Sequence, residues 1–214
     1  MRDITLRERI VATARRMNAL GINQGASGNV SARIEGGFIV TPSGMPYDEL
    51  EPADLVHMTM GGNKKGHRTP SSEWRFHRDI YANRPEAGAV VHTHSAFATT
   101  LACLGRGIPA FHYEVAFAGG SDIRCAPYKT FGTQDLSEVA VAALEGRRAC
   151  LLAHHGAIAF GADLDDALRL ADKVEALARL YWQAIQVEEP TILDEVEMAR
   201  IVERFRTYGR SPGG

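Results

Sequence analysis

The sequence predicts a single α/β domain. Apolar segments of strand length alternate along the chain with segments whose apolar residues recur at helical spacing. No internal repeat, low-complexity tract or linker interrupts this alternation. The length of 214 residues suits one domain that can bury a substantial core. We therefore expect residues 1–214 to fold as one unit.

The first part of the chain is expected to form one helix and two short strands. The helix runs from about Leu6 to Leu20 and stops at Gly21, because glycine favours a helix C-terminus. A glycine-rich bend is expected over residues 21–34. Short strands should follow, GFIVT at 37–41 and DLVHMTM at 54–60.

The middle of the chain should contain a helix, a strand and irregular segments. After a polar loop, the helix starts at Ser71-Ser72 and holds Glu73 in its first turn. The sequence AVVHTHSAF at 89–97 is typical of a buried strand, and an alternating segment continues to about Gly119. A turn-rich stretch at 119–133 comes next.

The last third should hold three helices and a strand–turn–strand unit. A helix is expected at 136–146, followed by two apolar strands joined by a turn within 147–161. Asp163 should cap a long amphipathic helix. A final helix runs from about Asp194 to Tyr208, and residues 209–214 form a flexible tail.

Composition excludes several classes of partner. A net charge of −2 gives no reason to expect binding to nucleic acid or to an anionic membrane. The N-terminus lacks the apolar stretch of a signal peptide, and no apolar run approaches the roughly 20 residues of a membrane span. The three cysteines form no CxxC pair, so neither a disulfide framework nor a cysteine zinc site is indicated. We expect a cytoplasmic protein.

Two histidines on one strand suggest a metal site. Alternate strand residues point to the same side, so His92 and His94 share a face and Thr93 lies opposite. A second cluster, His154-His155, stands where another apolar strand meets a turn, and only one of its two members can point the same way. With Glu73 as a fourth candidate, the set would suit zinc or another borderline divalent metal. The alternative is a group of hydrogen-bonded core histidines. The other histidines are interpreted as structural or surface residues: His57, His67, His77 and His112.

Three short segments could bind an anion. Gly28-Asn29, Ser43-Gly44 and Ser71-Ser72 offer backbone N–H groups and small polar side chains, and the last pair lies at a predicted helix N-terminus. Taken singly, each could be an ordinary turn or a helix cap. No nucleotide-binding fingerprint accompanies them, so a simple phosphate monoester fits better than a nucleotide if they converge.

Seven motifs occur in a familiar order: GNVS, TPSG, PSSEWRFH, VVHTHS, FGT, LLAHHG and RFRTYG. In this order the sequence resembles the class II sugar-phosphate aldolases of the aldolase/adducin family, and its similarity is closest to the fuculose-phosphate branch. The resemblance extends from the first helix to Tyr208. It implies a mixed, largely antiparallel central sheet sandwiched between helix layers. It also implies a homotetramer with active sites at the subunit interfaces.

The resemblance assigns roles that spacing alone leaves open. It implies one zinc ion per subunit, held by His92, His94 and His155, with Glu73 as fourth ligand and as acid/base. The residues implied to hold the substrate phosphate are Asn29, Ser43, Gly44, Ser71 and Ser72. The residues implied to complete the site are Tyr113 from a neighbouring subunit, Tyr208 near the C-terminus, and Phe131 at the aldehyde end.

The implied reaction is reversible cleavage of a 2-ketose 1-phosphate, namely L-fuculose 1-phosphate or a close analogue. The products would be dihydroxyacetone phosphate and a short aldehyde such as L-lactaldehyde. Glu114 follows Tyr113 directly, and a carboxylate there could alter the preferred aldehyde if it faces the site.

Three alternative functions remain open within this resemblance, two of them enzymatic. A sugar-phosphate 4-epimerase uses the same retro-aldol step, but such enzymes tend to have aspartate at the position of Glu73. A dehydratase of methylthioribulose phosphate uses a similar zinc site. An adducin-like interaction domain would have the fold without the catalysis.

Overall fold

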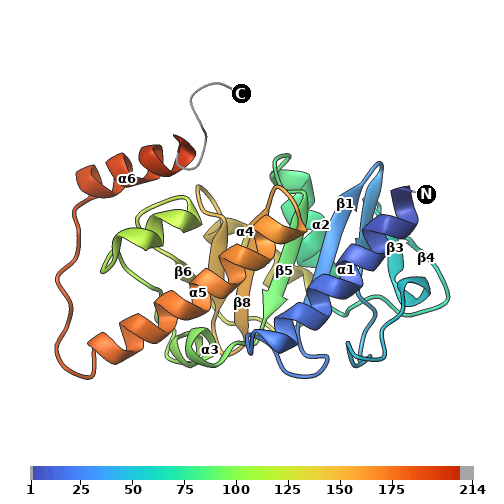
Figure 1. Ribbon diagram of the computed structural model, residues 1–214, viewed down its shortest axis with the longest axis horizontal. Helices are drawn as coiled ribbons and strands as arrows, with labels where there is room; N and C mark the ends of the chain where they lie inside the picture. Colours follow the sequence, from blue (N-terminus) through green and yellow to red (C-terminus); the bar gives the residue numbers. More distant parts are fainter. Residues whose placement is uncertain (1, 208–214) are drawn as a thin grey trace.

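The computed structural model describes residues 2–207 and shows one eight-stranded mixed sheet (Figure 1). The strand order is β4-β3-β2-β1-β5-β8-β7-β6, and every neighbouring pair is antiparallel except β6 and β7. The strands are β1 (Asn29–Ile34), β2 (Gly37–Val40), β3 (Val56–Thr59), β4 (Lys64–Lys65), β5 (Ala89–Thr93), β6 (Arg124–Ala126), β7 (Ala149–Leu152) and β8 (Gly156–Gly161).

Helices cover both faces of the sheet. One hydrophobic core lies between the sheet and α1, α3 and α5, and a second lies between the opposite face and α2 and α4. Figure 1 shows α1 and α5 crossing the same face, whereas α6 lies at the end of the molecule far from α1. The helices are α1 (Arg2–Ala19), α2 (Trp74–Asn83), α3 (Ala96–Cys103), α4 (Gln134–Ala143), α5 (Leu164–Ala184) and α6 (Glu195–Thr207), with short 3-10 helices η1 (Pro52–Asp54) and η2 (Tyr113–Ala118).

The alternation of β5 distributes its side chains between these two cores. Ala89 and Val91 lie in the core under α1 and α5, whereas Val90 lies in the core under α2. His92 follows the same alternation toward α2, where its ring meets Phe76 edge-on at 5.4 Å between centroids. The strand therefore delivers a fully buried imidazole to the start of α2.

The predicted layer architecture is confirmed: a mixed, largely antiparallel sheet lies between helices. The predicted cap of α5 is also confirmed, because the Asp163 side chain accepts a hydrogen bond from the Asp166 N–H at 2.9 Å. The β7–turn–β8 unit lies within the expected residues 147–161. Tyr208 and the tail at 209–214 lie outside the described residues.

One strand was missed at the N-terminal side. The expected bend at 21–34 contains β1, which pairs with both β2 and β5. Val30 and Ala32 do alternate with Asn29 and Ser31, but all four are buried, so the polar positions do not mark a solvent face. The short strands β4 and β6 likewise lie in segments interpreted as loop and turn.

The prediction of an alternating segment up to Gly119 is wrong, because this part of the chain forms α3 and η2. Helix α3 begins with a remote cap: the Glu175 carboxylate of α5 accepts hydrogen bonds from the Phe97 and Ala98 N–H groups at 2.9 and 2.8 Å. A cap supplied by a distant part of the chain leaves no local sequence signal.

The start of α2 also differs from the prediction. The helix begins at Trp74 rather than at Ser71-Ser72, and Glu73 occupies the N-cap position instead of the first turn. The reason is that the Ser71 N–H donates to the carbonyl of Thr41 at 3.0 Å, which ties the chain to a neighbouring loop before the helix can start.

Candidate metal centre and active site

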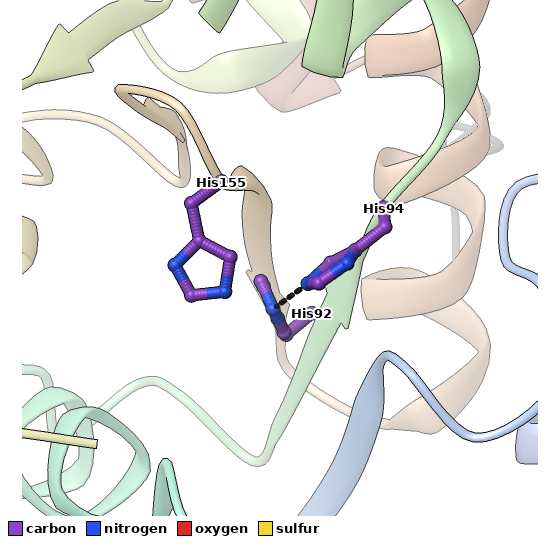
Figure 2. Close-up of side chains that lie close together, drawn as sticks. All are labelled: His92, His94 and His155. Atoms are coloured by element: carbon purple, nitrogen blue, oxygen red, sulfur yellow. Dashed lines mark hydrogen bonds between the residues drawn. The ribbon is translucent and has the colours of Figure 1, made fainter. Parts of the chain in front are cut away.

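Three histidines meet in the middle of the sheet, where β5 ends and β8 begins. His92 lies in β5, His94 just beyond its end, and His155 in the turn before β8. Because β5 and β8 are antiparallel partners with Thr93 opposite Ala157, the end of one strand lies beside the start of the other. Potential ligand nitrogens of the three rings lie within 4.8 Å of one another. Figure 2 shows the rings gathered there, with Nε2 of His92 2.9 Å from Nε2 of His94.

The turn before β8 decides which of two neighbouring histidines joins the group. His154 adopts a left-handed conformation with φ of 55° and is exposed, while His155 turns inward. Glycine at position 156 lets the start of β8 approach the end of β5 closely, because a Cβ atom there would lie 2.3 Å from the Thr93 carbonyl oxygen.

Glu73 reaches the histidines from the start of α2. Its side chain is buried, with Oε2 3.1 Å from Nε2 of His92 and Oε1 3.1 Å from Nε2 of His155. Within the described structure Oε1 makes no hydrogen bond despite this proximity. The Glu73 N–H donates to the Ser71 hydroxyl at 3.3 Å, which ties the backbone of the glutamate to the preceding turn.

The electrostatics of the cluster fit a cation. Nδ1 of His92 donates to the Ala157 carbonyl at 2.9 Å, which leaves Nε2 as the nitrogen that points to the cluster. Burial lowers the pKa of His94 to about 3, which keeps the His94 ring neutral. Burial opposes ionisation of Glu73, but nearby His92 and His155 outweigh it and hold the carboxyl pKa well below its usual range. Three imidazoles and an ionised carboxylate, one oxygen of which lacks a hydrogen bond, make a donor set for a divalent metal.

Two loops predicted to bind an anion lie side by side. The Ser43 N–H donates to the Thr69 carbonyl at 3.0 Å, and an isolated β-bridge joins Pro42 to Pro70. The segments 41–44 and 69–72 therefore run together. A cavity of about 510 Å³ is lined by residues of these loops, including Ser43, Gly44, His67 and Arg68.

Asn29 and the FGT motif approach the same region. Nδ2 of Asn29 donates to Oε2 of Glu73 at 2.9 Å. The carbonyl of Gly132 accepts a hydrogen bond from Arg75 of α2 at 2.7 Å. Phe131 thus lies next to the start of α2, and it is 66% exposed.

The ring and ion-pair contacts of two predicted residues, Tyr113 and Glu114, lie outside the histidine cluster. Tyr113 begins η2 with its side chain 49% exposed, and its ring contacts are with His112 and Phe205. Glu114 forms an ion pair with Lys173 of α5 at 3.0 Å, which directs its carboxylate toward α5.

Sequence reasoning missed two polar residues behind the cluster. His77, interpreted as structural or surface, is fully buried, and its Nε2 lies 2.5 Å from Oδ1 of Asn29. Ser31 contacts the other ring nitrogen of His77 at 2.6 Å. The available signals were spacings: His77 is four residues from Glu73 on one helix face, and Ser31 is two residues from Asn29 on one strand face.

The comparisons with known proteins identify the family. The family described as "Class II Aldolase and Adducin N-terminal domain" matches residues 8–182. This chain belongs to that family. A 5-methylthioribulose-1-phosphate/5-deoxyribulose-1-phosphate aldolase of Rhodospirillum rubrum is 55% identical over 206 residues, covering 96% of this chain and 93% of the relative. An L-fuculose phosphate aldolase of Escherichia coli is 46% identical over 205 residues, covering 95% of both chains.

A solved structure agrees with the sequence relatives. The structure of an L-fuculose 1-phosphate aldolase matches with a TM-score of 0.92 and 36% identity, covering 94% of this chain and 96% of the other. This class II aldolase is therefore a metal-dependent aldehyde-lyase, and the predicted enzyme class is confirmed. Among residues 2–207, no helix combines the length and apolar character of a membrane span.

Proposed function

We propose that this class II aldolase reversibly cleaves the C3–C4 bond of a 2-ketose 1-phosphate to dihydroxyacetone phosphate and a short aldehyde. The observation that carries the proposal is the convergence of His92, His94, His155 and Glu73 beside the paired 41–44 and 69–72 loops. This arrangement pairs a candidate metal centre with loops whose serine hydroxyls and remaining backbone N–H groups suit a phosphate.

Zinc is the metal that the donor set favours, at one ion per subunit. His92, His94 and His155 would hold it through ring nitrogens, and Glu73 would supply a fourth ligand before substrate binds. The chemistry that the bound metal supplies is Lewis-acid stabilisation of negative charge on the ketose oxygens.

The phosphate would be held by Asn29, Ser43, Gly44, Ser71 and Ser72. Hydrogen bonds between the 41–44 and 69–72 loops would keep the spacing of the four loop residues fixed before the substrate arrives. Such an anchored phosphate orients the reacting carbons and reduces the entropy lost on reaching the transition state.

Proton transfers would fall to Glu73 and to tyrosines. Cleavage requires a base for the C4 hydroxyl proton and an acid for the carbon that was C3 of the ketose. Tyr113 of a neighbouring subunit would take the first proton. Glu73, which is ionised in the free site, would take the proton of the C3 hydroxyl as the substrate displaces it, and would then deliver that proton to C3. Tyr113 would return its own proton to the C3 oxygen of the product. The exposure of Tyr113 supports a role across an interface in a homotetramer. Tyr208, near the C-terminus, would assist these proton transfers.

We further propose that the aldehyde half of the substrate ends in an apolar group. Two aromatic side chains of the segment before α4, Tyr128 and Phe131, are exposed and available to an apolar group. The Tyr128 ring lies 5.9 Å from that of His154, in the turn that carries His155. The relatives are named for 5-methylthioribulose 1-phosphate, 5-deoxyribulose 1-phosphate and L-fuculose phosphate. All three ketoses end in a methyl or methylthio group.

A substrate panel tests this proposal. The three ketose phosphates named above are compared with ribulose 1-phosphate, which carries a terminal hydroxyl instead. We expect each apolar-ended substrate to give a kcat/KM about 10-fold or more above ribulose 1-phosphate, since one small apolar group is worth about 1–3 kcal/mol. Equal rates for all four would contradict the apolar pocket. Formation of the C4 epimer without release of an aldehyde would instead identify the epimerase.

A further inference from the structure

A chain of buried hydrogen bonds runs from the core of the protein to Glu73. Tyr81 O–H lies 2.7 Å from the Ser31 hydroxyl, which lies 2.6 Å from Nδ1 of His77. Nε2 of His77 lies 2.5 Å from Oδ1 of Asn29, whose Nδ2 donates to Oε2 of Glu73 at 2.9 Å. All five side chains are at most 5% exposed, so water does not compete for these bonds.

The chemistry of Glu73 fixes the direction of every bond in this chain. An ionised carboxylate can only accept, so Asn29 must turn its NH₂ group toward Glu73 and its carbonyl toward His77. His77 must therefore carry its proton on Nε2 and accept at Nδ1 from Ser31. The Ser31 oxygen then accepts from the tyrosine O–H.

His77 supports the same direction from the other side of Asn29. Burial lowers its pKa to about 3, so the ring is neutral and has one donor and one acceptor nitrogen. A proton on Nδ1 would turn the lone pair of Nε2 toward the carbonyl of Asn29 and favour a flipped amide. The flipped amide would turn its own oxygen toward the Glu73 carboxylate, and two acceptors would face each other.

The orientation of Asn29 matters because the last torsion of a glutamate side chain is broad. The Asn29 hydrogen bond holds Oε2 and so leaves Oε1 directed toward His155 without a hydrogen bond of its own. The carboxylate is thereby held in one rotation with a free oxygen facing the histidine cluster.

We propose that His77 is a positioning residue that acts through Asn29 to set the rotation of the Glu73 carboxylate. This inference rests on the proposed role of Glu73 as metal ligand and acid/base. His77 touches neither metal nor substrate, and its effect is transmitted by the Asn29 amide.

The first test replaces His77 with an apolar ring. Partners that orient metal ligands typically contribute about 10–100-fold in metal affinity or activity. We expect His77→Phe to weaken zinc affinity by about that factor, measured by competition with a chromogenic chelator, and to lower kcat much more than it changes KM. Ile80→Ala is the control, because Ile80 is fully buried on the same helix and lies outside the chain of hydrogen bonds.

The second test keeps the imidazole and uses no substrate. With ¹⁵N-labelled histidine, long-range ¹H–¹⁵N spectra of the whole protein should show His77 as the neutral Nε2–H tautomer. Ser31→Ala removes the donor to Nδ1, so a mixture of tautomers and an intermediate loss of zinc affinity should follow. Tyr81→Phe leaves the Ser31–His77 bond in place and should change both readouts less.

Two results would overturn the proposal: a proton on Nδ1 in the unaltered protein, or a folded His77→Phe variant whose zinc affinity and kcat equal those of Ile80→Ala. The tautomer and affinity measurements need no sugar phosphate, so a wrong substrate assignment would appear in the activity assay alone.

Discussion

Asn29 and His92 stand directly opposite each other where β1 pairs with β5. This register joins the two halves of the site, since Asn29 belongs to the proposed phosphate group and His92 to the histidine cluster. Because the sheet ladder fixes their separation, a phosphate and a metal would be presented to one substrate at a constant spacing. The metal centre and the phosphate loops should therefore be rigid before substrate binds.

The histidine ligands can be tested against a neighbour in the same turn. We expect His155→Ala to lose bound zinc and to lower kcat/KM by about 10³-fold or more, because a metal-dependent lyase loses its Lewis acid. His154→Asn is the matched control, since His154 is exposed with a φ of 55° and asparagine tolerates that conformation. Metal content by mass spectrometry and the rate of aldol cleavage give the answer. Retention of zinc by the His155 variant would contradict the ligand assignment.

Glu73 should affect chemistry more strongly than substrate binding. Glu73→Gln keeps the size of the side chain but removes its charge, so we expect kcat to fall by about 10²–10⁴-fold while KM changes little. Steady-state kinetics on zinc-reconstituted protein measure the effect. An unchanged kcat would show that another group supplies the proton.

Mixing subunits of two variants tests whether Tyr113 acts across a subunit interface. In a head-to-tail ring of four, a working site needs Glu73 from one subunit and Tyr113 from the next. Glu73→Gln and Tyr113→Phe homo-oligomers should each be nearly inactive, yet an equal mixture that is unfolded and reassembled should recover about one quarter of the unaltered activity. No recovery in mixed oligomers would place both residues in the same subunit or exclude Tyr113 from the site.

Stability should depend on pH through His77. The pKa of this histidine is about 3 in the folded protein, while an unfolded histidine has a pKa of about 6.5. Below pH 6.5 the unfolded chain binds a proton that the folded protein does not, so stability falls as the pH is lowered. For the metal-free protein we expect this group to contribute a loss of about 1–2 kcal/mol between pH 6.5 and 5, measured by urea unfolding. His77→Gln should reduce that slope, and an identical slope in both proteins would contradict the assignment.

Sequence and structure agree best where one local pattern carries the information. The alternation around His92 predicted that His94 shares its face, and the turn residues placed His154-His155 at a strand end. Spacing alone could not choose His155, because the choice depends on the left-handed conformation of His154 and on a pairing of β5 with β8 across more than sixty residues of chain. The family resemblance supplied that choice.

The errors arose where distant groups determine the structure. Helix α3 depends on a cap from Glu175 of α5, and α2 starts late because Ser71 is bonded to Thr41. Strand β1 was not predicted because its polar residues are buried rather than on a solvent face. One of them, Ser31, belongs to the hydrogen-bond chain that ends at Glu73. A polar residue that is satisfied by a partner far along the chain looks like a loop residue in the sequence.

The most direct test of the central claim is release of dihydroxyacetone phosphate from the apolar-ended ketose 1-phosphates by three preparations: native, chelator-treated and zinc-restored protein. We expect release by the native protein, loss after chelation and recovery with zinc. If zinc-loaded, folded protein releases no dihydroxyacetone phosphate from any of these ketose phosphates, the proposed lyase activity is wrong.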